Sequence, residues 1–211
     1  LTLLLAYNLD AQKQDKMLKV YLGNKQFYDP TIGNYIEFQL HFEGHTLNYV
    51  PTKEGLLGEV VVIMEVKAFD SIVRSDAYRL KSPVMKDSIF DDFYDVKRFA
   101  LNPGDYTLSI ELKDFNSENE SIKATKKIHV NDFSKGIQVS DVQVSEMISK
   151  GEENSVFFKS GYNLIPRIIS FYPQEYHGLP AYLEIYNTNL SEDSVFALKQ
   201  FIYDKSTNTE V

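Results

Sequence analysis

Apolar and polar residues alternate with a period of two along much of the chain. From residue 35 to residue 43 every second side chain is apolar, which predicts a strand with one face on a core and the other in water. The inward side chains would be Ile36, Phe38, Leu40 and Phe42, and the outward ones Tyr35, Glu37, Gln39, His41 and Glu43. Residues 59–68 repeat the pattern, with outward Val61 and Ile63 that indicate a strand covered on both faces.

Further strands are predicted at residues 72–80, 106–113 and 122–130, where apolar residues again alternate with polar ones. Shorter apolar segments predict strands at residues 156–158, 168–172, 182–186 and 195–203. Residues 191–200 are the best candidate for a helix, because Glu192 and Asp193 suit a first helical turn, but a strand is favoured there. The chain is therefore predicted to be all-β.

One local motif is informative about the kind of β fold. Residues 101–106 read LNPGDY, so Pro103 and Gly104 make a tight corner and Tyr106 opens the next strand. A tyrosine just after such a corner resembles the tyrosine corner of sandwich domains, where the hydroxyl bonds back to the loop. We expect Tyr106 to be buried with its hydroxyl on nearby backbone.

The strand pattern predicts two immunoglobulin-like β-sandwich domains in tandem. The first would span residues 12–131, residues 132–136 have the composition of a linker, and the second would span residues 137–211. A sandwich of this class takes about 100 residues and about seven strands. The second domain is shorter than this, so we expect it to be incomplete and to need strands from beyond Val211 or from a partner.

The first residues, LTLLLAYNLDAQ, admit two interpretations. Residues 1–11 resemble the tail of a secretory signal peptide cleaved after Ala11. The alternative is a first strand at residues 1–7. The signal interpretation is favoured, and it predicts an exported protein.

Composition narrows the functional classes. Hydrophobic residues make up 43% of the 211, which is enough for a core, and the formal net charge is −8. Nucleic-acid binding needs concentrated positive charge, so that class is set aside. There is no Cys, which excludes disulfides and thiolate metal sites. No later segment has the roughly 20 apolar residues of a membrane span.

The sequence offers little that could carry chemistry. His41 and His45 flank a strand end, where residues four apart are too far from each other to share one metal ion. Asp87, Asp91, Asp92 and Asp95 cluster in a segment expected to lie as a loop across the sandwich, and a calcium role is the alternative to a solvated loop. Nucleophile-elbow, dinucleotide-binding and phosphate-loop motifs do not occur. We therefore predict no catalytic, cofactor-binding or metal-binding residue, and no cofactor.

Four segments carry a resemblance to a known family. They are KVYLGNKQFYDPTIGNYIEFQLHFEGHTL at 19–47, LNPGDYTLSIELKD at 101–114, IQVSDVQVSE at 137–146 and LPAYLEIYN at 179–187. Together they resemble the N-terminal part of bacterial GWxTD-domain proteins, although the GWxTD motif itself does not occur in this chain. The resemblance implies export and a sandwich architecture, and it implies no catalytic residue.

The favoured function is therefore an exported, non-catalytic module for protein binding or scaffolding in a bacterial cell envelope. A protein partner, or a downstream part of the same chain, is expected to bind it, and a small-molecule ligand is left open. One alternative is a carbohydrate-binding module, against which the absence of Trp counts. The other is an accessory domain of an enzyme whose active site lies outside this chain.

Overall fold

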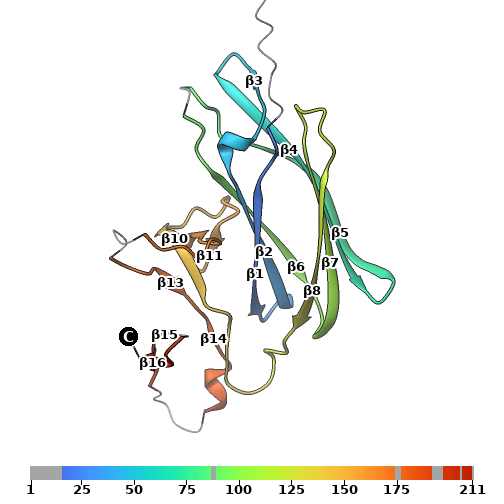
Figure 1. Cartoon of the computed structure of the whole chain (residues 1–211). Helices are drawn as coiled ribbons and strands as arrows, with labels where there is room; N and C mark the ends of the chain where they lie inside the picture. The colour runs from blue at the N-terminus through green and yellow to red at the C-terminus, as the bar shows by residue number, and fades with distance from the viewer. Residues whose placement is uncertain (1–15, 87–88, 174–176, 192–196, 205, 211) are drawn as a thin grey trace, which may run out of the picture.

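The structure is a computed structural model, and it describes residues 16–210 except 87–88, 174–176, 192–196 and 205. The N-terminal segment 1–11, with both of its interpretations, therefore lies outside the described residues. The described chain is all-β, as predicted (Figure 1). We call residues 16–131 the first region, residues 132–136 the connecting segment and residues 137–210 the second region.

The first region contains eight strands and one short 3-10 turn. They are β1 (Val20–Asp29), β2 (Gly33–Phe42), η1 (Gly44–Thr46), β3 (Tyr49–Pro51), β4 (Leu56–Ala68), β5 (Ser71–Lys81), β6 (Phe93–Ala100), β7 (Gly104–Asp114) and β8 (Ile122–Val130). One antiparallel sheet has the order β1-β2-β6. In the other, β4 lies between β5 and β7, β8 pairs with β7, and β3 pairs with the start of β4.

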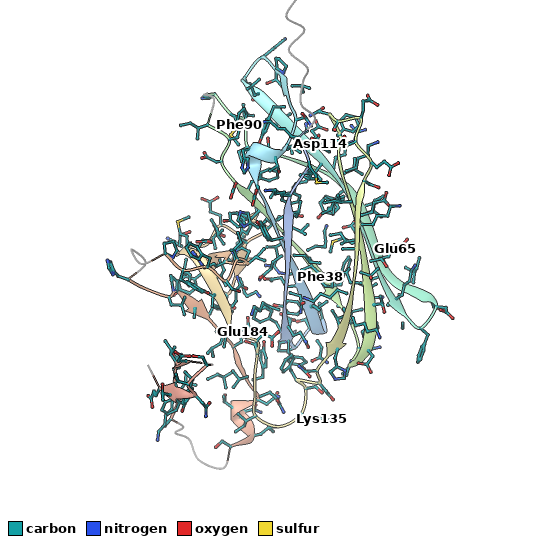
Figure 2. The ribbon with its side chains drawn as sticks, in the orientation of Figure 1. Phe38, Glu65, Phe90, Asp114, Lys135 and Glu184 are labelled. Carbon is teal, nitrogen blue, oxygen red and sulfur yellow. The ribbon has the colours of Figure 1, made fainter. Side chains whose placement is uncertain are left out.

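The two sheets pack face to face as a β-sandwich, and one continuous hydrophobic core fills the space between them (Figures 1 and 2). The predicted inward faces of β2 and β4 are confirmed, since Phe38 and Met64 are fully buried and pack in this core. On the outward face of β4, Val61 and Ile63 are only half-buried. The prediction that β4 is covered on both faces is therefore wrong for the described residues.

The outward face of β2 is also different from the prediction. Glu37 is 1% exposed, Gln39 2% and His41 4%, so this face is not in water. The second region and the flanking aromatic side chains of β1 and β6 cover it. Alternation of polar residues was consistent with a solvent-facing strand, but the same alternation also fits a face buried under polar partners.

The second region also covers the free edge of β1. The backbone N–H of Gln26 donates to the Asp141 carboxylate, its C=O accepts from the N–H of Asp141, and the N–H of Tyr28 donates to the hydroxyl of Tyr186. Unpaired edge groups are open to pairing with another chain, so these contacts protect β1.

The connecting segment is anchored. Phe133 is 4% exposed, its N–H donates to the Asn34 side chain, and its C=O accepts from the side chain of Asn187. The predicted hinge at residues 132–136 thus makes specific contacts with both regions, and the division into two domains stays a prediction.

The second region is built from much shorter strands. They are β9 (Gln138–Val139), β10 (Gln143–Lys150), β11 (Phe158–Lys159), β12 (Tyr162–Pro166), β13 (Ala181–Tyr182), β14 (Ile185–Tyr186), β15 (Tyr203–Asp204) and β16 (Thr209–Glu210), with the turn η2 (Thr188–Leu190). Four of them form a sheet in the order β11-β12-β10-β13, and the others pair as β14-β9 and β15-β16.

Several strand predictions for the second region are corrected by this arrangement. Residues 168–172 form no strand, because the chain there crosses from β12 towards β13. In the described part of residues 195–203, only Tyr203 is in a strand. The described part of residues 191–200 is not helical, and residues 192–196 lie outside the described residues. The expected strand at 182–186 is divided between β13 and β14, which pair with β10 and β9 respectively.

The predicted tyrosine corner is confirmed in its hydrogen bond. The Tyr106 hydroxyl donates to the backbone C=O of Asn102 at 2.9 Å. The ring is half-buried at the margin of the core rather than fully buried, so the burial part of the prediction is wrong. The corner still ties β7 to the loop that precedes it.

Candidate functional site

A buried charged cluster joins the two regions. It consists of Glu37 on β2, Arg98 on β6 and Lys159 on β11. The Arg98 Nε donates to Glu37 Oε2 at 2.8 Å, and the Lys159 Nζ lies 2.9 Å from the same oxygen. Arg98 also donates to the backbone C=O of Phe158, which fixes β11 over the outer face of the first sheet. A carboxylate with two cations and a third donor, the Gln39 amide, is fully satisfied.

Aromatic rings surround the Lys159 ammonium. Its Nζ lies 3.0 Å from the ring centroid of Phe27, and the rings of Tyr35 and Tyr182 follow at 5.6 and 5.8 Å. The contact with Glu37 is therefore an ion pair without a well-directed hydrogen bond, since the ring of Phe27 takes part of the ammonium's donor surface. Cation–π attraction of this kind is strongest where water is excluded.

The cluster shifts the pKa values of its members. Burial lowers the pKa of Lys159 to about 8, although the Glu37 carboxylate opposes the shift. Burial acts to raise the pKa of Glu37, but the charges of Lys159 and Arg98 outweigh it and hold this pKa below its ordinary value. A lowered lysine pKa is also found in catalytic sites. Lys159 is 6% exposed, and it also lines the cleft described below.

Glu184 organises the lower boundary between the regions (Figure 2). The hydroxyl groups of Tyr182 and Tyr186 donate to its two carboxylate oxygens, both at 2.6 Å. Burial raises the pKa of each tyrosine, and the hydrogen bond to Glu184 raises it further. These hydroxyls therefore stay protonated as donors, and Tyr186 stacks edge-on against Tyr28.

An open cleft of about 620 Å³ lies beside this boundary. Its lining includes Arg98 and Glu184 from opposite sides, together with Tyr35, Ser160 and Ile32. The charged lining groups have partners within the protein. Arg98 and Lys159 pair with Glu37, Glu184 accepts from the two tyrosine hydroxyls, and Asp29 accepts from the backbone N–H groups of Thr31 and Ile32. Ser160 also lines the cleft, and its Oγ forms a hydrogen bond with the Tyr182 hydroxyl.

The histidines do not converge. His41 is buried on β2 between the rings of Tyr21 and Tyr94, and its Nε2 is 2.8 Å from Asp92 Oδ2. His45 is exposed near Glu43, His129 pairs with Asp105 at 2.7 Å, and His177 is exposed. The expectation that His41 faces solvent is wrong, because the sequence gives no sign of the aromatic rings that enclose it.

The acidic segment expected to be a loop is partly a strand, because residues 93–95 belong to β6, and its carboxylates have separate roles. Asp92 binds His41 and the backbone N–H of Gly44, and Asp95 is buried and accepts the hydroxyl of Tyr78. Asp87 lies outside the described residues. In the part of the chain that the structure describes, no three His, Asp or Glu side chains are arranged to hold a metal ion.

Exposed apolar side chains concentrate in the second region. Among the described residues of the second region, the buried hydrophobic ones are Leu164 and Tyr186, whereas nearly all the others belong to the first region. The exposed ones include Val139, Met147, Val156, Phe171, Leu179, Leu190, Phe201 and Ile202. Large contiguous patches of exposed apolar surface mark interaction sites in folded proteins.

No described helix is long and apolar enough to cross a membrane. Comparison of the chain with family models, with curated proteins and with solved structures found no match.

Proposed function

We propose that this chain is a non-catalytic β-sandwich module that binds or scaffolds other proteins. The observation that supports the proposal most strongly is the contrast in burial. The first region has its own core, while the second leaves large apolar side chains such as Phe171, Phe201 and Ile202 more than half exposed. Surface of this kind is stabilised when a partner covers it.

The site geometry favours binding over chemistry. The buried cluster of Glu37, Arg98 and Lys159 is ion-paired within the protein and connects the second region to the first. Its effect is to present the apolar surface on a fixed support, as binding modules do. Export to a bacterial cell envelope is part of the proposal, supported by the signal-like residues 1–11 and by the resemblance to the N-terminal part of GWxTD-domain proteins.

Site-specific photocrosslinking in the cells that produce the protein tests the proposal. A photoreactive amino acid is placed at Phe171 or Phe201 in the second region, and at exposed Phe115 in the first region as a matched control. We expect discrete protein adducts from the second-region positions and not from Phe115. Equal adduct yields at all three positions would contradict the proposal, as would turnover of any substrate in a broad hydrolase panel.

A carbohydrate-binding role is the second candidate. It is supported by exposed tyrosine rings, Tyr162 at 51% and Tyr203 at 55%, because aromatic faces stack on sugars. Calorimetric titration with cell-wall oligosaccharides distinguishes the two candidates. Binding that is lost in both Tyr162→Ala and Tyr203→Ala would favour this second function.

A further inference from the structure

The long strands at the edges of the first region are each protected. The second region covers β1, as described above. β5 and β6 are linked across the sandwich by the Tyr78–Asp95 hydrogen bond and the Lys97–Asp76 ion pair. β8 carries the exposed lysines Lys123, Lys126 and Lys127. Covering by another part of the chain and lysine charges are known means of preventing edge-to-edge pairing.

Among the described residues, no strand or charged cover protects one half of an edge of β10 in this way. β13 pairs only with Gln143 and Val144 of this strand, while β12 occupies the opposite edge from Ser145 to Lys150. Residues 147–150 are exposed, among them Met147 at 52% and Ile148 at 36%. No described strand lies along this half of β10 on the β13 side.

The backbone groups on this edge can be assigned. The N–H of Arg167 donates to the C=O of Val144, and the N–H of Gly151 donates to the C=O of Gly161, so both ends of the pairing with β12 are fixed. A β-bulge separates Ser145 from Met147. Since antiparallel strands direct alternate residues to opposite sides, Met147 and Ser149 face β12, and Ile148 and Lys150 direct their N–H and C=O groups to the open edge.

The sequence of this edge is complementary to itself. Residues 146–150 read Glu-Met-Ile-Ser-Lys. In an antiparallel pair of two copies centred on Ile148, the isoleucines face each other and Glu146 of each copy lies opposite Lys150 of the other. Opposite charges across a strand pair are favourable. Glu146 keeps its ion pair with Arg167 at 2.6 Å, and a carboxylate can accept more than one cation.

We propose that a second copy of this chain occupies the open edge of β10, pairing antiparallel about Ile148 to make a two-fold symmetric dimer. The inference rests on the proposed binding function and names its partner. After Lys150 the chain turns towards β12, where the Gly151 N–H donates to the Gly161 C=O, so β10 itself ends there. A two-fold pairing uses the edge in both copies and is therefore closed against further addition.

The contact is short, so the dimer is weak. Sedimentation equilibrium of the full chain should show monomers at about 1 μM and dimers increasing towards about 1 mM, the range expected of a small interface. Lys150→Glu places like charges opposite each other and should weaken association at least about tenfold. Ile148→Lys, which puts two lysines face to face at the centre, should weaken it further.

Lys126→Glu on the protected edge of β8 is the matched control and should leave association unchanged. Thermal unfolding of each variant establishes that it is folded, and either β10 variant alone suffices for the comparison. A chain that stays monomeric throughout contradicts the inference, and so does a dimer unaffected by both β10 variants. If the chain is monomeric but Phe171 still crosslinks to a different protein, self-pairing fails while the proposed binding function stands.

Discussion

The two regions of the molecule use opposite means to become ordered. The first region buries two apolar faces, of β2 and β4 among others, in a continuous core. The second buries little apolar surface of its own and is held by polar contacts: the Lys159–Glu37 ion pair, the Arg98 bridge and the hydrogen bonds to the edge of β1. Burial of apolar area is the dominant favourable term in folding. The first region should therefore be stable independently, while the order of the second depends on it.

The largest expected effect comes from separating the regions. A chain of residues 16–136 should retain a cooperative urea transition, because it keeps the whole core. Residues 137–211 alone should show none. Circular dichroism during a urea titration measures the unfolding of each fragment. A cooperative transition of the isolated second region would contradict the comparison.

Truncating one buried leucine in each region tests the comparison between the two regions in more detail. Leu40→Ala removes a fully packed core side chain and should lower the free energy of unfolding by about 3–5 kcal/mol. Leu164→Ala, at 2% exposure in the second region, should leave the global transition of the first region nearly unchanged. Urea denaturation of the two variants provides the test, and equal losses of global stability would argue against independent regions.

Removal of one partner from the buried cluster tests how the regions are held together. Lys159→Met leaves the Glu37 carboxylate with Arg98 as its one cation and should weaken docking of the second region by about 3–5 kcal/mol, the usual cost of breaking a buried pair. Limited proteolysis should then cut the second region faster. Lys126→Met, on the exposed surface of β8, is the control and should not change the cleavage rate.

The pH dependence follows from the shifted groups. The pKa of Lys159 is about 8 in the folded protein and ordinarily 10.5, so the unfolded chain binds more protons between these values and stability rises with pH there. Burial raises the pKa of Tyr35 and Tyr78, which stay protonated in the fold while the unfolded chain ionises above pH 10. Stability should therefore pass through a maximum near pH 10. Urea titrations from about pH 7 to about pH 11 test this dependence. The Lys159→Met variant should lose the rise in stability below the maximum and keep the fall in stability above it.

The smallest expected effect is at the tyrosine corner. Tyr106→Phe removes one hydrogen bond, to the C=O of Asn102, and should cost about 1 kcal/mol. Thermal unfolding measures it. No loss of stability would mean that the corner contributes nothing to the first region.

Strand length explains which parts of the fold could be predicted from the sequence. β2 and β4 run for 10 and 13 residues, long enough for alternation to identify the inward side chains. β11, β13 and β14 have two residues each, which is too short for any period to be read. The burial of the outward face of β2 was not predicted, because a strand with alternating polar residues has the same sequence pattern whether water or polar protein groups contact that face.

The charged cluster had no sequence signal either. Glu37, Arg98 and Lys159 lie on three strands of two sheets, and only the tertiary fold brings them together. Their individual contexts resemble those of ordinary surface charges. The acidic loop, in contrast, attracted attention by its composition, but Asp92 and Asp95 serve different structural partners.

Native-state hydrogen exchange of the intact chain tests the central claim most directly. Amides of β2, β4 and β7 should exchange only through global unfolding, while those of β10 and β12 should exchange through a local opening of distinctly lower free energy. That difference is the result expected if the second region is held by the first. Equal protection in both regions, lost together in a single cooperative event, would contradict the account.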